Sequence, residues 1–267
     1  MQTRRFAATM LAVATSVGLG VTGCGPATSK NDSSGPLPTC SPTNPNAAGR
    51  QAEGKAELTS AAGWVTEQTV RVATEDTETT GGAVTHAQER SGSVHFKFRK
   101  TDRTILITVF GDDVYFNMHN VPGISFGTSY TLSRSQVPVG SRLDFAPEDP
   151  GNVSRLVNAV VDVCRDGAGK AGGKSGFAGE LDLMATPHAD EALCRKYGRK
   201  VHAVPFTAAT DDQGRLVEFA IQMNALGPDL GTARTTWHKV DGQTSPLKPR
   251  NIEPAGDVLA LLKALES

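Results

Sequence analysis

The sequence predicts an α+β fold for residues 50–267, with an antiparallel sheet as the main element. Residues 94–99 alternate strictly between apolar and polar side chains, which is the pattern of a half-buried strand. Residues 104–110 form a continuous apolar run, a Gly-Asp-Asp turn follows, and residues 114–118 return, which predicts a hairpin. A long sheet combined with a few amphipathic helices is the α+β pattern.

Further strands are expected on both sides of this hairpin. The remaining candidates are residues 65–74, 177–184, 201–208, 216–223 and 232–240. The turn at residues 211–214 lies between two of them and predicts a second hairpin. The last candidate carries Trp237.

Helices are expected at fewer places. Asp149 and Pro150 resemble an N-cap followed by proline at the first helical position. Apolar residues then recur at helical spacing through Cys164, so we expect one helix from residue 150 to that cysteine. A second short helix is expected to open at residues 186–187 and to end at Gly198. Weaker helical signals lie at residues 51–62 and at the C-terminus from Asp257.

The N-terminus has the features of a lipoprotein signal peptide, which we assign to residues 1–23. Two arginines precede an uncharged stretch at residues 6–21, as in a secretory signal. The stretch ends in the sequence Val-Thr-Gly-Cys, a lipobox in which the thiol of Cys24 would receive a diacylglyceryl group. The alternative is an ordinary cleaved signal with an incidental cysteine. The arginine pair faintly suggests a twin-arginine signal, but its flanking residues fit the general secretory route better.

Residues 24–49 are expected to be the lipidated cysteine and a disordered tether. Gly, Pro, Ser, Thr and Asn dominate this segment, so it buries too little apolar surface to fold. As a flexible coil it would span on the order of 25–30 Å. The protein is therefore expected on the extracytoplasmic face of the cell membrane, held by its N-terminal acyl chains.

Composition narrows the range of partners and cofactors. The formal net charge is −1 and no basic stripe is present, so a nucleic acid is not expected as a partner. Cys164 and Cys194 could form a disulfide in an oxidising compartment. Cys40 is left over, either free or paired between molecules. The cysteine spacings match no zinc motif, and we expect neither a metal nor a cofactor.

The sequence shows no convincing catalytic pattern. It contains no Gly-x-Ser-x-Gly elbow, no His-Glu-x-x-His sequence and no phosphate-binding glycine loop after a strand. The six histidines are scattered. We therefore do not expect an enzyme.

Several segments taken together resemble a known group of lipoproteins. They are residues 110–116, the helical pattern at 156–163, and residues 204–207, 212–217, 236–239 and 246–249. In this order, after a lipobox and a tether, they resemble the LppX/LprG-type lipoproteins of actinobacteria, which share the LolA-like fold. The resemblance implies a strongly curved antiparallel sheet, a half-barrel wrapped over helices, enclosing a hydrophobic cavity for a lipid or lipoglycan. The cysteines at 40, 164 and 194 and the C-terminal helix depart from that pattern.

If the sheet encloses a cavity, its walls should come from alternate strand residues and from the helix. The expected wall residues are Phe96, Phe98, Ile107, Val109, Phe116, Phe219 and Ile221, with Leu156 and Val160 from the helix. An ordinary packed core is the alternative for the same residues. The predicted function is a monomeric carrier of a lipid or hydrophobic ligand, with an envelope protein as a further candidate partner. The alternative is an envelope interaction or sensor module with a filled core and no ligand.

Overall fold

The computed structural model describes residues 47–121, 124, 127–137, 144–166, 176–256 and 260. The predicted signal peptide and nearly all of the predicted tether lie outside these residues. The same holds for most of the predicted C-terminal helix.

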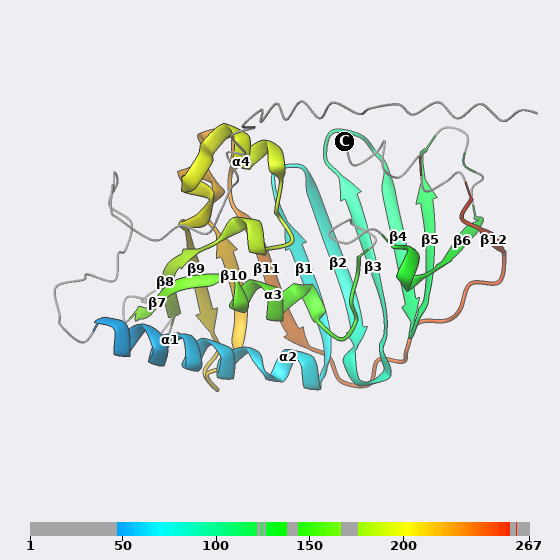
Figure 1. The fold of residues 1–267 in the computed structure, drawn as a ribbon. Coiled ribbons are helices and arrows are strands. Elements are labelled where there is room, and N and C mark those ends of the chain that lie inside the picture. The colour runs from blue at the N-terminus through cyan, green and yellow to red at the C-terminus, as the bar shows by residue number, and fades with distance from the viewer. Residues whose placement is uncertain are drawn as a thin grey trace, which may run out of the picture.

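A single twelve-stranded sheet forms the body of the molecule, in the order β12-β6-β5-β4-β3-β2-β1-β11-β10-β9-β8-β7 (Figure 1). The strands are β1 Thr69–Glu75, β2 Thr79–His86, β3 Ser91–Phe98, β4 Thr104–Phe110, β5 Asp113–His119, β6 Ser129–Ser133, β7 Val160–Asp166, β8 Gly176–Leu181, β9 Val204–Thr210, β10 Leu216–Ile221, β11 Ala233–Lys239 and β12 Ile252–Pro254. All neighbours are antiparallel except β12 and β6, which are parallel. The sheet is open, because β12 and β7 form its two edges.

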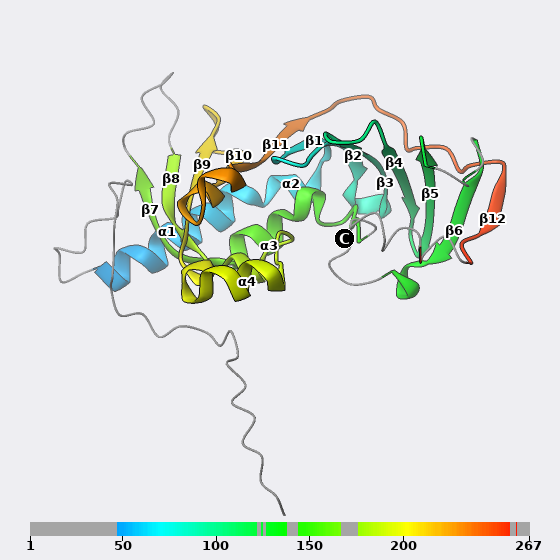
Figure 2. The same ribbon diagram turned by 90° about the horizontal axis from the view of Figure 1, so that it is seen from above.

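The helices lie on one side of this sheet. They are α1 Ala47–Ala62, α2 Trp64–Glu67, α3 Val153–Asn158 and α4 Glu191–Tyr197. Short 3-10 turns lie at Ala87–Glu89, Arg134–Gln136, Pro150–Asn152, Leu183–Ala185, Gly198–His202, Met223–Ala225 and Pro228–Leu230. Seen from above, the sheet arches over the helices, so they occupy its concave side (Figure 2).

The strand register gathers the apolar side chains on the concave face. Ala83 pairs with Val94, Val94 pairs with Ile107, and Ile107 pairs with Phe116. Since residues opposite one another in a ladder point to the same face, these residues form one continuous apolar row. The same rule places every predicted strand residue of the cavity wall on this face.

The strand predictions match the structure well, with differences at their ends. The hairpin of residues 104–118 forms as β4 and β5, and the one around residues 211–214 forms as β9 and β10. The predicted strand 65–74 begins later, because Val65 belongs to α2. The sequence patterns did not indicate β2, β6 or β12. Thr, Gly and Ser occupy many positions of the first two, which weakens the apolar alternation, and β12 has only three residues.

The predicted helix running through Cys164 is wrong beyond residue 158. The helix α3 ends at Asn158, and β7 begins at Val160, so neither Val160 nor Cys164 is helical. Val160, Val161 and Val163 are β-branched and favour a strand. Their helical spacing is therefore coincidental, and the pairing with β8 decides the structure.

The second predicted helix forms as α4, but it begins later than expected. Asp190, rather than Thr186, is its N-cap, and the Asp190 carboxylate accepts a hydrogen bond from the backbone N–H of Ala192. It ends before Gly198, as predicted. Cys194 in α4 and Cys164 in β7 are both disulfide-bonded. Their pairing with one another stays a prediction.

Trp237 holds in place the segment before α3, which covers part of the concave face of the sheet. Its indole is fully buried, and Nε1 donates a hydrogen bond of 2.8 Å to the carbonyl oxygen of Pro150. The next residue, Gly151, has a φ of +64°, and a Cβ there would lie 2.8 Å from Cγ1 of Val72 and 2.9 Å from Nε1 of Trp237. Only glycine permits this approach of the backbone to the sheet.

We predict that Trp237→Phe destabilises the protein more than Trp64→Phe. Trp64 is a matched control, because its Nε1 also donates to a backbone carbonyl, that of Leu216 at 3.0 Å, but Trp64 is only half-buried. Removing the Trp237 donor leaves a buried carbonyl unsatisfied, which costs about 1–3 kcal/mol in addition to the lost packing. Urea unfolding of both variants measures the difference. Equal losses would contradict the anchoring role.

The pairing of β8 with the edge strand β7 brings two carboxyl groups close together. Glu180 in β8 pairs with Asp162 in β7. Glu180 is an exposed residue, but partial desolvation raises the pKa of its carboxyl above the usual value, and the neighbouring Asp162 carboxylate raises it further. The native state therefore binds this proton more tightly than the unfolded chain does. At pH values above the raised pKa, the ionised Glu180 carboxylate lowers the free energy of unfolding. This loss of stability disappears as the pH falls through that pKa and the carboxyl becomes protonated in the native state.

We expect Glu180→Gln to remove this loss of stability, because glutamine carries no charge. The variant should gain stability relative to the parent near pH 7, and the gain should shrink as the pH is lowered toward 4. Urea unfolding across this range gives the difference, and Asp162→Asn should reproduce part of it. A gain that is the same at every pH would show that the carboxylate charge is not the cause.

Candidate functional site

A cleft opens on the concave face, between the sheet and the segments that cover it. Its volume is about 470 Å³. It lies over β1, β2, β3 and β11, and it is bounded by residues 144–156, 187–193, 223 and 230. These segments are far apart in the sequence, and the curvature of the sheet brings them together (Figure 2).

The middle of the cleft floor is apolar, and Thr74, Thr79 and Thr235 border it on the same face of the sheet. Val72 pairs with Ala83, and Ala83 pairs with Val94, so three neighbouring strands supply one row of side chains. Phe96 lies beside this row, and its ring covers Gly81, where a Cβ would be 2.9 Å from Cδ1. Leu156 of α3 adds an apolar side chain from the covering segment.

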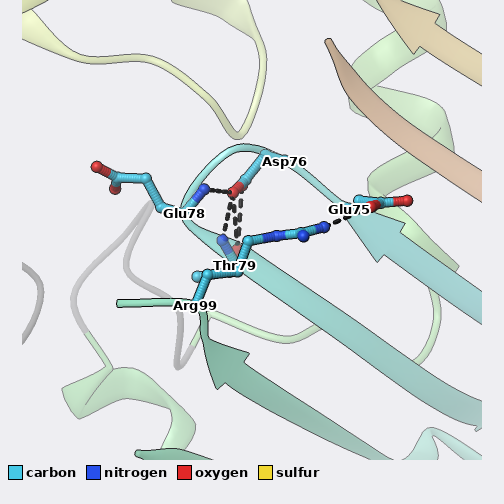
Figure 3. Close-up of polar contacts among 5 residues, drawn as sticks. All are labelled: Glu75, Asp76, Glu78, Thr79 and Arg99. Atoms are coloured by element: carbon cyan, nitrogen blue, oxygen red, sulfur yellow. Dashed lines mark hydrogen bonds and ion pairs between the residues drawn. The ribbon is translucent and has the colours of Figure 1, made fainter. Parts of the chain in front are cut away.

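The mouth of the cleft includes the tight turn between β1 and β2. The Asp76 carboxylate accepts hydrogen bonds from the backbone N–H groups of Glu78 and Thr79, at 2.8 and 2.6 Å, and from the Thr79 hydroxyl at 3.1 Å (Figure 3). Glu75 is paired with Arg99 in the same view. The Glu78 side chain points away from this turn, and it lies 3.5 Å from Lys100. The turn is therefore held rigidly while it carries several negative charges.

Further carboxylates come from the covering segments. Asp149 accepts a hydrogen bond of 2.7 Å from the backbone N–H of Ser154, and Asp190 accepts one of 2.7 Å from that of Ala192. Asp144 lies 3.9 Å from Arg155, in a loose ion pair. In each aspartate one oxygen, Oδ1, accepts one backbone N–H, and the negative charge of the carboxylate remains in place. Six carboxylates and two guanidinium groups thus line the cleft, those of Glu75, Asp76, Glu78, Asp144, Asp149 and Asp190 and those of Arg155 and Arg234.

Only two of the predicted wall residues line this cleft. They are Phe96 and Leu156. Phe98 is half-buried and packs against the core. The others are at most 3% exposed within the packed core, and they are Ile107, Val109, Phe116, Val160, Phe219 and Ile221. For these residues the packed-core alternative describes the structure.

The sequence reasoning did not identify most of the residues that line the cleft. Val72 lies inside a predicted strand, and the alternation of apolar and polar residues along that strand is a signal that its side chain faces the interior. Asp149 was recognised as an N-cap but not as part of a site. Ala83 belongs to β2, which was not predicted. The carboxylates meet only in three dimensions, so no spacing in the sequence could have grouped them.

The described residues contain no group of three or more His, Cys, Asp or Glu that could hold a metal ion. Small-molecule sites usually combine an apolar lining with a small number of polar groups, and this cleft carries more charge than that, with six carboxylates and two guanidinium groups. Among the helices that the structure describes, none combines the length and the apolarity needed to cross a membrane.

No protein-family model matches the sequence, and no curated protein matches it. Among solved structures, a LolA superfamily protein from Nitrosomonas europaea is similar at 11% identity, with a TM-score of 0.25. The match covers 70% of this chain and 94% of that one. This similarity is too low to carry an argument about ligand or activity.

Proposed function

We propose that this chain is an exported lipoprotein that binds a lipid or another hydrophobic ligand in its concave cleft, as a carrier at the cell envelope. One observation carries the proposal: a cleft of about 470 Å³ with an apolar floor lies on the concave face of the sheet. This volume is within the ~300–1,000 Å³ range of small-molecule sites. The lipobox at Cys24 and the sequence resemblance to LppX/LprG-type lipoproteins support the same proposal.

Binding in this cleft requires no covalent change. Each methylene that leaves water for the apolar floor would contribute about 0.8 kcal/mol. The cleft is smaller than the whole concave face, because the residues around Ile107 and Phe219 are already packed. We therefore propose that one chain of the ligand, rather than several, occupies it.

A second candidate function is an envelope interaction module with no ligand. The filled core favours it, since six predicted wall residues are buried against protein. Under this alternative the cleft would be an incidental gap between the sheet and its covering segments. The two functions predict different results for a variant that fills the cleft. A carrier would lose its bound lipid, whereas an interaction module would have no lipid to lose.

We predict that Ala83→Trp abolishes co-purification of lipid while the fold survives. Ala83 lies in the middle of the apolar floor, so an indole there would occupy the cleft. Ala73→Trp is the matched control, because Ala73 lies on the opposite face of the paired strand and is exposed. Native mass spectrometry and lipid extraction of protein purified from its own membrane measure the bound lipid. If the parent protein carries no lipid at all, the carrier proposal is wrong and the interaction module remains.

We predict that Cys24→Ala detaches the protein from the membrane. Without the thiol no diacylglyceryl group can be attached, so the domain should be released or accumulate as uncleaved precursor. Cys40→Ala is the control, since Cys40 lies outside the lipobox. Fractionation and mass analysis of the N-terminus give the result. Unchanged processing and retention in Cys24→Ala would reject lipid anchoring, but they would leave ligand binding in the cleft open to its own test.

A further inference from the structure

We infer that the cleft selects amphiphiles with a positively charged head group and discriminates against anionic ones. This inference rests on the proposed function, because it assumes that a ligand chain occupies the apolar floor. It adds the chemical class of the head group. Two features of the cleft carry it together: the apolar floor that would receive the chain, and the excess of carboxylates among the groups that the head would meet.

The position of the carboxylates follows from the path of the chain around the floor. Asp76 belongs to the β1–β2 turn, Asp149 precedes α3, and Asp190 precedes α4. Each one fixes the backbone of its own segment by accepting N–H hydrogen bonds. The same hydrogen bonds hold the three charges in place around the cleft, so a cationic head would meet a preorganised negative field without an ordering cost.

The two arginines of the lining do not reverse this field. Arg155 lies 3.9 Å from Asp144, and Arg234 lies 3.3 Å from Glu218. Each guanidinium thus already has a carboxylate partner. Glu75 and Glu78 are likewise paired, with Arg99 and Lys100, so the negative field of the cleft comes from Asp76, Asp149 and Asp190. An anionic head would have to displace one of these pairs or remain among uncompensated negative charges, and both are unfavourable.

Three amphiphiles with the same twelve-carbon chain separate the contributions of chain and head. Dodecyltrimethylammonium, dodecyl maltoside and dodecanoate are titrated, below their micelle concentrations, into the full mature chain carrying Cys24→Ala, produced in an oxidising compartment. At low salt and pH 8 we expect the cation to bind roughly tenfold more tightly than the anion, with the maltoside between them. In about 0.5 M salt the ratio should shrink, because screening weakens exposed charges.

A charge-removing variant tests the carboxylates directly. Asp149→Asn combined with Asp190→Asn keeps an oxygen acceptor for each backbone N–H, since asparagine is a good N-cap. It should reduce the preference for the cation by about two- to fivefold and leave maltoside binding unchanged. Asp211→Asn is the matched control, because Asp211 also accepts backbone N–H groups but does not line the cleft. If circular dichroism shows that the double variant is unfolded, Glu78→Gln replaces it, with a smaller reduction expected.

The outcomes distinguish this inference from the proposed function. A preference for the cation that falls with salt and in the Asn variant supports the inference. Equal affinity for the three amphiphiles, or a preference for dodecanoate, overturns it while ligand binding in the cleft stands. Binding of none of the three, in parent protein that also carries no lipid from its own membrane, overturns both.

Discussion

The hydrogen bond from Trp237 to the Pro150 carbonyl determines how the concave face of the sheet is covered. A curved sheet with one apolar face must bury that face against something. Here the indole fixes the backbone just before α3, and Gly151 lets that backbone approach Val72 without a clash. The six-residue helix is too short to be stable by itself, so its place on the sheet depends on this contact together with the burial of Val153, Leu156 and Val157. The boundary of the cleft depends on it as well.

The mixed character of the cleft follows from this mode of covering. A long amphipathic helix would have presented a continuous apolar stripe to the sheet. The 16-residue α1 covers β7 and β10, but short segments with turns cover β1, β2 and β3. A side chain that accepts backbone N–H groups stabilises the start of such a segment. Asp149 and Asp190 serve this purpose. The fold therefore places negative charge around an apolar floor as a consequence of how its short elements begin.

The sequence predicted the sheet better than the site. Alternation along residues 94–99 and the apolar run at 104–110 identified the central strands and placed Phe96 and Ile107 on one face. Alternation cannot say whether that face meets protein or a ligand, so most predicted wall residues proved to be core. The predicted helix failed at Val160 because β-branched residues at a helical spacing also suit a strand, and only the partner β8 decides. The carboxylates could not be grouped from the sequence, because only the folded chain brings their separate segments close together.

If the protein is a carrier, the charged groups around the cleft matter more than its apolar floor for the free energy of taking a ligand from a membrane. Acyl chains are about as stable in the core of a bilayer as on an apolar protein surface, since both remove the same methylenes from water. Burial of a chain on the floor of Val72, Ala83 and Val94 therefore cannot by itself draw a ligand out of a membrane. The free energy that decides the transfer must come from the head group, which leaves one polar environment for another. Under the proposed function that second environment would be the set of carboxylates around the cleft, so their charge rather than the apolar surface would set which amphiphile is taken up.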